Sequence, residues 1–294
     1  MAGMDADTEL EDVFALVADQ TRLDILRVLW ERRVDEERTG EGGVSFSTLR
    51  EEVGVRDSGR FNYHLDKLVP SFVRSDEDGY SLTYAGQRII GAAVSGVYTD
   101  SGTELEALSA GVCTSEGCEG TIQARYRGGE ATIACNSCDR ETVITAPPIL
   151  AGAHDPAESP DVLGRYALTV IQKTIRGFCH LCSGPVRASV SDDRPDEGRG
   201  EQITVLHRCQ ECGSTSYTSA AVLLIDDPAV ISLFYDAEID YRQILFWRKT
   251  RSYDWEETIV DEDPLEIEVT FAVGEEELTI TMDERLDPVA YDRA

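Results

Sequence analysis

All eight cysteines of this 294-residue chain lie between residues 113 and 212, and they form four close pairs. Two or four residues separate the members of a pair: Cys113 and Cys118, Cys135 and Cys138, Cys179 and Cys182, and Cys209 and Cys212. Two thiolates at such a spacing can point to one position, and a hairpin brings two such pairs together. The pattern therefore predicts two zinc-ribbon-like modules, each of which holds one structural Zn²⁺ by four cysteine thiolates.

Other uses of paired cysteines fit this chain less well. A disulfide framework is improbable in a cytosolic chain of this size, and a thioredoxin-type redox pair would not need four copies. Sites of four thiolates are closed, which favours a structural over a sensing role and leaves no open position for catalysis. We expect each ion to be held within one set of four, although spacing alone also allows crossed pairing. His180 and His207 lie beside the cysteines, but we do not expect them to be ligands.

The two cysteine sets resemble each other in sequence. Residues 118–124 align with 182–188, and residues 138–150 align with 212–224. The offset grows from 64 to 74 because the second set carries an acidic insertion around residues 192–200. This similarity indicates an internal duplication. It predicts one hairpin from residues 121–126 and 131–134, and another from 186–190 and 203–207.

The chain is strongly acidic, with 56 Asp and Glu against 27 Lys and Arg and a net charge of −29. Only three basic residues are lysines (Lys67, Lys173 and Lys249). In ordinary buffer such a surface repels phosphate, whereas molar salt screens charges within about 3 Å. The composition therefore predicts a protein of a halophilic cytoplasm. No apolar run approaches the roughly 20 residues of a membrane span, and the polar N-terminus is unlike a signal peptide, so we expect no membrane partner.

The first hundred residues contain no cysteine and show helical periodicity. We expect helices near residues 10–17, from Asp19 onward, at 45–53, at 58–69 and at 83–97, with a polar loop at 35–43. Residues 76–79 between two short strands are a hairpin signal. The order helix, helix, short helix, capped helix, hairpin and helix predicts a winged helix-turn-helix.

Three segments of this region resemble the ArsR-type winged-helix regulators, especially their archaeal members. They are residues 18–26 (ADQTRLDIL), 61–68 (FNYHLDKL) and 80–86 (YSLTYAG), and the resemblance covers about residues 8–98. It implies a transcriptional regulator that reads double-stranded DNA with the helix at 58–69. Metal-sensing members often carry cysteines on the preceding short helix. Residues 45–53 have none, so that sensing mode is absent.

On a helical wheel the predicted recognition helix has two distinct sides. Phe61, Leu65 and Leu68 form an apolar back, and polar side chains form the front. A helix in the major groove needs this division. The candidate DNA contacts are Arg56, Ser58, Arg60, Asn62, Tyr63, Lys67 and Arg74, with Arg60 suited to guanine and Asn62 to adenine. We expect His64 to be packed and hydrogen-bonded at the edge of the core rather than to contact a base.

The segments after each cysteine set carry less specific signals. Residues 161–175 and 228–236 read as helices, and residues 256–260, 266–273 and 277–282 read as strands. We expect a small antiparallel sheet with one carboxylate-bearing face. Its glutamates fit a solvated surface better than an acid–base pair.

Together these patterns predict an α+β chain of four regions. They are a winged helix-turn-helix at 1–100, a first zinc-ribbon-like module at 108–156, a helix with a second module at 157–227, and an acidic helix and β-hairpin region at 228–294. The predicted function is a dimeric, sequence-specific transcriptional regulator, with its dimer contacts near residues 10–17 and 83–97. Its zinc-stabilised half would bind transcription machinery or an unknown effector. The alternative is an adaptor protein that does not read DNA sequence, because Asp57 and Asp66 make the reading face less positive. We find no nucleophile–base constellation and predict no enzyme activity.

Overall fold

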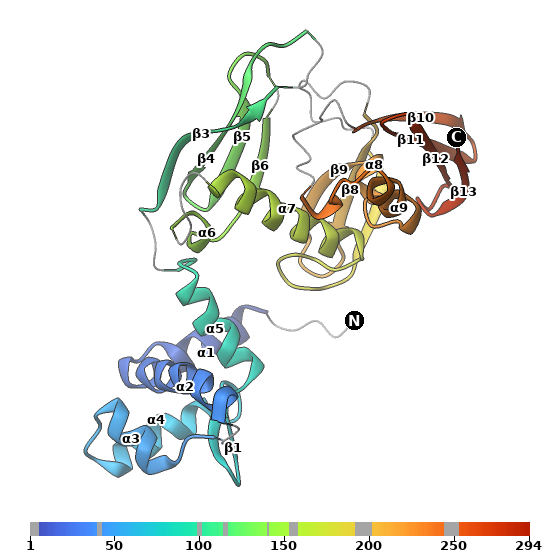
Figure 1. Ribbon diagram of the computed structural model, residues 1–294. Coiled ribbons are helices and arrows are strands. Elements are labelled where there is room, and N and C mark those ends of the chain that lie inside the picture. Colours follow the sequence, from blue (N-terminus) through green and yellow to red (C-terminus); the bar gives the residue numbers. More distant parts are fainter. Residues whose placement is uncertain are drawn as a thin grey trace. The chain divides into compact units, whose positions relative to one another are not determined.

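The computed structural model describes residues 6–39, 43–98, 102–113, 117–139, 141–152, 158–191, 202–243 and 253–294. The chain divides into two compact units, Met1–Asp100 and Ser101–Ala294 (Figure 1). It is an α+β protein with several small antiparallel sheets, as the sequence predicts. No helix in the described part of the chain is both long enough and apolar enough to cross a membrane.

The described residues of the first unit form five helices and one hairpin. In chain order these are α1 (Ala6–Val17), α2 (Gln20–Thr39), α3 (Phe46–Val53), α4 (Ser58–Leu68), β1 (Val73–Asp76), β2 (Gly79–Leu82) and α5 (Tyr84–Val94). The core is built around Leu26, Leu49, Phe61 and Leu65, which are almost completely buried. Val44 adds an antiparallel bridge to Tyr80 of β2 and so extends the hairpin.

Local side-chain chemistry sets the helix starts in this unit. Asp19, Ser45, Asp57 and Thr83 each accept a hydrogen bond from the third backbone N–H that follows, which satisfies a donor that the first helical turn leaves unpaired. Gly54 ends α3 in the left-handed conformation, at φ +77°.

Helix α2 is longer than predicted, because residues 35–39 are helical instead of part of a loop. The segment is polar, but its arginine and glutamate residues are good helix formers. No glycine or proline interrupts it before Gly40. Polarity alone was therefore the wrong signal for a helix end.

The second unit begins with a four-stranded antiparallel sheet in the order β3-β4-β5-β6. Its strands are β3 (Glu104–Val112), β4 (Thr121–Arg127), β5 (Glu130–Cys135) and β6 (Glu141–Thr145). Helix α6 (Ile149–Gly152) follows, and then α7 (Ser159–Ile175). Leu163 and Ala167 of α7 pack against the sheet's buried side. The predicted hairpin is present as β4 and β5, but the outer strands β3 and β6 were not foreseen.

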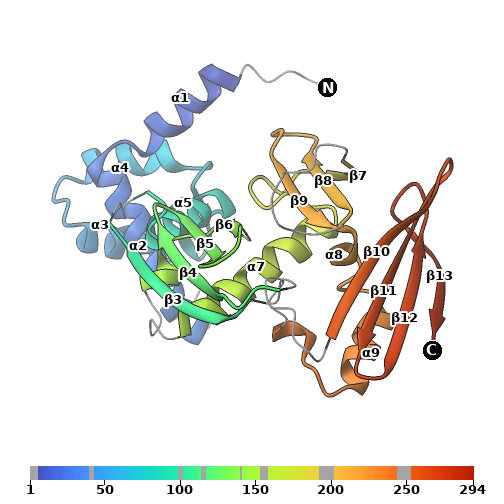
Figure 2. The ribbon, with the colours of Figure 1, turned by 90° about the horizontal axis from the view of Figure 1, so that it is seen from above.

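A second sheet has the order β7-β8-β9 and contains the other predicted hairpin. Its strands are β7 (Val186–Val190), β8 (Thr204–Cys209) and β9 (Thr215–Ser219), and α8 (Ala220–Leu223) follows directly. Figure 2 shows α7, this sheet and the C-terminal strands β10–β13, all of which belong to the second unit.

The chain ends in a small antiparallel sheet, as the sequence predicts, but the sheet has four strands where three were expected. Helix α9 (Pro228–Asp236) and the 3-10 helix η2 (Tyr241–Gln243) lead to β10 (Tyr253–Glu262), β11 (Leu265–Val273), β12 (Glu276–Met282) and β13 (Pro288–Arg293). Alternating residues such as Val269 and Ile280 are completely buried. They share one core with Val205 of β8, Ala220 of α8 and Leu233 of α9. The predicted regions 157–227 and 228–294 therefore share one hydrophobic core.

Candidate metal centres and candidate nucleic-acid interface

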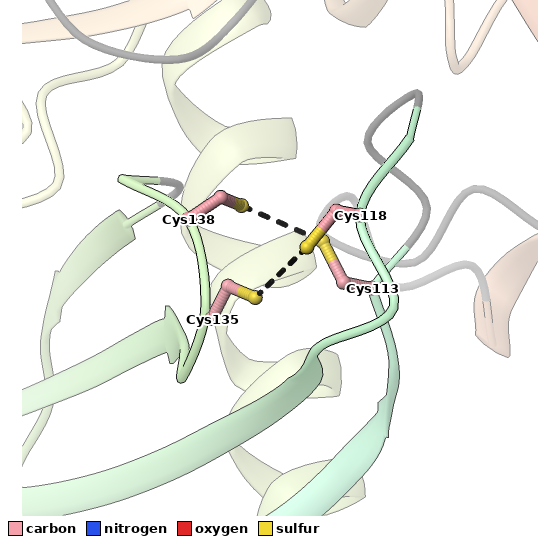
Figure 3. A group of neighbouring side chains, drawn as sticks. All are labelled: Cys113, Cys118, Cys135 and Cys138. Carbon is pink, nitrogen blue, oxygen red and sulfur yellow. Dashed lines mark hydrogen bonds between the residues drawn. The ribbon is translucent and has the colours of Figure 1, made fainter.

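The first cysteine set converges at one end of the β3–β6 sheet (Figure 3). Cys113 follows β3, Cys118 precedes β4, Cys135 ends β5, and Cys138 lies in the turn between β5 and β6. The Sγ atoms of Cys113 and Cys138 are 3.8 Å apart, and those of Cys118 and Cys135 are 3.7 Å apart. All four sulfurs lie within 4.8 Å of one another.

The second set forms an equivalent cluster beside β7 and β8. The Sγ atoms of Cys179 and Cys212 are 3.7 Å apart, and those of Cys182 and Cys209 are 3.5 Å apart. Cys182 and Cys212 are exposed, whereas no cysteine of the first cluster is. The clusters form within each set, so the predicted pairing is confirmed and crossed pairing is not found.

The sulfur positions fit a tetrahedral metal ion. Metal–sulfur bonds of about 2.3 Å in tetrahedral geometry place the sulfurs about 3.8 Å apart, close to the separations in both clusters. A disulfide would need about 2.05 Å, and none of the eight cysteines forms one. Four soft thiolates in this geometry suit zinc or iron. Each cluster can therefore hold one metal ion, consistent with two structural metals per chain.

Backbone amides point at the sulfurs in both clusters. The N–H of Gly120 donates to Cys118 Sγ at 3.4 Å, and the N–H of Gly184 donates to Cys182 Sγ at 3.3 Å. The Gly120 N–H lowers the pKa of Cys118, but burial and the three neighbouring thiols outweigh it and raise that pKa to about 12. Crowded thiolates repel one another, and a bound cation removes that penalty.

The exposed face of α4 is the candidate nucleic-acid interface in the first unit. Phe61, Leu65 and Leu68 are buried against the core, as the helical wheel predicted. All seven candidate DNA-contacting residues are exposed: Arg56, Ser58, Arg60, Asn62, Tyr63, Lys67 and Arg74. Arg56 lies in the turn before α4, and Arg74 lies on β1.

The candidate residues differ in how far their side chains are already engaged. The Asn62 amide donates to Asp66 Oδ2 at 2.7 Å, and the Arg74 guanidinium donates to Ser81 Oγ at 3.1 Å. Lys67 Nζ lies 5.8 Å from the centre of the Tyr63 ring. Within the described residues, the Arg60 guanidinium has no ion-pair partner, which leaves it available to a ligand.

Two protein-family models together match most of the chain. The family model for a domain of unknown function, DUF7351, matches residues 110–287, more than half of the sequence. The chain belongs to the DUF7351 family. A second family model, for the domain of unknown function DUF7347, matches residues 10–93. No curated protein and no solved structure matches the chain.

The DUF7351 region contains both cysteine clusters, and they share a close backbone approach that the sequence did not reveal. The Cys113 N–H donates to the Gly120 carbonyl at 2.8 Å, and the Cys179 N–H donates to the Gly184 carbonyl at the same distance. A Cβ at Gly120 would lie 2.5 Å from Cys135 Sγ, and one at Gly184 would lie 2.7 Å from Glu211 Cγ. The clash at Gly120 is with a cysteine of the cluster, so glycine is required there, whereas the exposed Glu211 side chain can move to accommodate a Cβ at Gly184. The only sequence signal was that these glycines align between the two sets.

The two histidines beside the second cluster stay outside it. The His207 ring is buried and lies 2.8 Å from Thr218 Oγ1, and burial lowers its pKa to about 4, so the ring is neutral. Burial, and then the charge of Lys173, lower the pKa of His180. Lys173 itself donates to Ser183 Oγ at 3.0 Å and so braces the Cys179–Cys182 turn.

Within the DUF7347 match, His64 packs at the edge of the core. Its ring is buried, and its Nδ1 lies 3.2 Å from Asp19 Oδ1, although the two groups are not aligned for a hydrogen bond. Burial opposes ionisation of Asp19, but the Arg22 backbone N–H and the His64 charge outweigh it and lower the pKa of Asp19. His64 thus joins α4 to the start of α2 and does not face solvent.

Proposed function

We propose that this chain is a sequence-specific DNA-binding transcriptional regulator of the ArsR type. Residues 1–100 would form its winged helix-turn-helix. The observation that carries the proposal is the division of α4: Phe61, Leu65 and Leu68 are buried, while Arg60, Asn62, Tyr63 and Lys67 are exposed. A helix anchored in this way can present its polar side to the major groove.

The surroundings of α4 support this proposal. Helix α3 precedes it across a short turn, and both helices contact α2. The hairpin β1–β2 with the bridge at Val44 has the form of a wing. Arg74 is exposed on that hairpin, where it can reach a DNA backbone.

Exposed apolar side chains support a two-fold dimer. Phe14 of α1 is 58% exposed, Val94 at the end of α5 is 56% exposed, and Tyr98 after that helix is 67% exposed. Such side chains on the surface of one unit favour a protein interface. A dimer through α1 and α5 would present two copies of α4 to the two halves of a palindromic site.

We propose that each of the two tetra-cysteine clusters binds zinc. We also propose that the folds around them are duplicated zinc-ribbon modules. Their matched strand registers, with Ile122 opposite Cys135 and Val186 opposite Cys209, support the duplication. Four thiolates complete a tetrahedral zinc site and leave no position for a substrate. The role we assign is therefore structural, in a half of the protein that would bind an effector or transcription machinery.

An adaptor that does not read sequence is the second candidate. It is favoured by the Asn62–Asp66 hydrogen bond and by the contact between Arg74 Nε and Asp76 Oδ2 at 3.2 Å. These contacts engage two of the seven side chains proposed to bind DNA. An adaptor would use the same face for a protein partner.

Selection from a random duplex library by the zinc-loaded full chain separates the two candidates. The selection should run in about 2 M KCl, where phosphate attraction is largely screened. Enrichment of a palindromic motif is the result expected of the regulator. Recovery of an unenriched library, from a folded protein that retains its metal, would favour the adaptor.

A further inference from the structure

In the sheet β7-β8-β9, one side of β8 and β9 faces the core and the other side opens to solvent, whereas Ala188 of β7 is exposed even on the core side. Val205, His207 and Cys209 of β8 point inward and are almost completely buried. Their neighbours alternate to the other face, since successive strand residues point to opposite sides. The open face carries Arg187 and Ser189 from β7, Leu206 and Arg208 from β8, and Thr215 and Tyr217 from β9.

Two arginines lie directly opposite each other on this face. Arg187 of β7 pairs with Arg208 of β8 in the antiparallel register, and both side chains are exposed. Like charges directly opposite one another destabilise a sheet. Neither guanidinium has an ion-pair partner among the described residues. Strands β7, β8 and β9 contain no Asp or Glu, so no carboxylate of these three strands neutralises the pair.

The cross-strand row of residues next to the two arginines contains an aromatic ring. Tyr217 is 46% exposed and sits opposite Leu206, which in turn sits opposite Ser189. The two rows are two residues apart along each strand, about 7 Å. The face therefore offers a flat ring and two cations at neighbouring positions.

The equivalent face of the first module lacks this combination. There the position of Tyr217 is taken by Val143, and those of Arg187 and Arg208 by Gln123 and Ala134. Its own exposed arginines share the sheet with Glu104, Glu130 and Glu141, and Arg127 Nε lies 3.1 Å from Glu104 Oε1. Among the residues that the structure describes in the two sheets, arginines without an ion-pair partner thus lie next to an exposed aromatic ring in the second module and not in the first.

We propose that the open face of β7-β8-β9 binds single-stranded nucleic acid. Tyr217 stacks on an unpaired base, and Arg187 and Arg208 contact the adjoining phosphates. Stacking on an aromatic side chain needs a base whose face is free, which a single strand provides and a duplex hides. The chemistry is common to DNA and RNA. This site is separate from α4 and does not depend on its reading duplex DNA.

Fluorescence anisotropy with labelled dT and rU oligonucleotides of about 12 nucleotides, a length within the usual site size, tests the proposal on the zinc-loaded full chain. Tyr217→Ala should weaken binding about tenfold, whereas Tyr217→Phe, which keeps the ring, should bind like the wild type. Arg187→Gln with Arg208→Gln should reduce the slope of log affinity against log salt by about 1.4, since each single-strand phosphate contact contributes about 0.7. Comparison of the two oligonucleotides distinguishes DNA from RNA as the preferred strand.

Two controls separate this site from other surfaces. Arg125→Gln removes an exposed arginine from the first module's sheet and should leave binding unchanged. Arg27→Ala, which removes an exposed arginine of the first unit that pairs with Asp24, should also leave it unchanged. The proposal is overturned if the wild type binds neither oligonucleotide, or if Tyr217→Ala has no greater effect than Arg125→Gln. Displacement of the single strand by polyglutamate, or by an equal nucleotide concentration of blunt duplex, would overturn it as well.

Discussion

The Glu257 carboxylate accepts a 3.0 Å hydrogen bond from the backbone N–H of Ala221, at the start of α8. The same side chain, which extends from β10, also accepts from the N–H groups of Ile203 and Ala220 at 2.7 and 3.3 Å. Ser219, at the N-cap position of α8, makes no capping bond with its own side chain. A residue of the C-terminal sheet therefore caps a helix that follows the second cysteine cluster.

We expect Glu257→Ala to lower the free energy of unfolding by about 2–3 kcal/mol, because three amides next to a buried core lose a charged acceptor. Glu257→Gln keeps one acceptor oxygen and should cost less. Denaturant unfolding followed by tryptophan fluorescence measures both effects. The neighbouring Glu256 is exposed, so Glu256→Ala should change stability by less than about 0.5 kcal/mol. Equal effects at 256 and 257 would contradict the capping role.

Arg60 should read a base in the proposed DNA complex. We expect Arg60→Ala to weaken binding to a selected duplex at least tenfold, and to weaken binding to random duplex much less, since a bidentate contact to guanine discriminates by about 1–3 kcal/mol. Electrophoretic mobility shifts on the two duplexes measure the difference. Arg27→Ala is the matched control, because Arg27 is exposed on α2 and pairs with Asp24 at 3.3 Å. A uniform loss on both duplexes would assign Arg60 to the phosphates.

Each of the two clusters should contribute one metal ion to the metal content of the protein. Counting four thiolates per ion, we expect about two zinc ions per chain in the purified protein. Cys135→Ser and Cys209→Ser should each leave about one. Elemental analysis by mass spectrometry gives these ratios and identifies the metal. A folded wild-type protein that contains no metal would contradict the proposed centres.

The second centre should release its metal first. Cys182 and Cys212 are exposed, whereas the first cluster has one buried and three half-buried cysteines, so thiol reagents reach the second cluster more easily. Titration with a mercurial in the presence of a coloured zinc chelator should show one fast and one slow release. The Cys135→Ser variant should retain the fast phase and Cys209→Ser the slow one. The reverse assignment would show that exposure does not control release.

Gly86 should tolerate no side chain. A Cβ there would lie 2.3 Å from the Phe72 carbonyl oxygen, so α5 would have to move, and we expect Gly86→Ala to destabilise the first unit by about 1–3 kcal/mol. Gly91 is on the same helix, and its added Cβ would meet Trp30 at an ordinary 3.8 Å. Gly91→Ala should therefore be neutral or stabilise by up to about 1 kcal/mol. Thermal unfolding of the two variants tests this contrast directly.

Several features could be predicted because they depend on short-range chemistry. Cysteine spacing gave the two sets of four, and local sequence patterns placed helices at 45–53 and 58–69, close to the observed α3 and α4. The apolar spacing of Phe61, Leu65 and Leu68 gave the buried side of α4. The helix patterns depend on residues a few positions apart. The metal sites depend on paired cysteines, which have few other uses in such a chain.

Other features could not be predicted, because distant segments create them. Glu257 belongs to an acidic strand that we expected to be solvated, yet it caps α8 from 36 positions away. All residues of strand β13 are exposed, so its sequence has no alternation of buried and exposed residues that would predict a strand. It forms because its backbone pairs with the edge of β12. The clash at Gly120 likewise arises only once Cys135 has folded back across the hairpin.

The sequence by itself determined which residues can ligate a metal and which side of α4 is apolar, since residue type and helical period fix both. Only the tertiary structure decided that the two cysteine sets close separately and that the second module shares a core with the C-terminal sheet. It also placed Arg187 opposite Arg208 beside an exposed Tyr217. The physical reason is that strand register and sheet pairing bring together residues whose spacing along the chain carries no information about their contact.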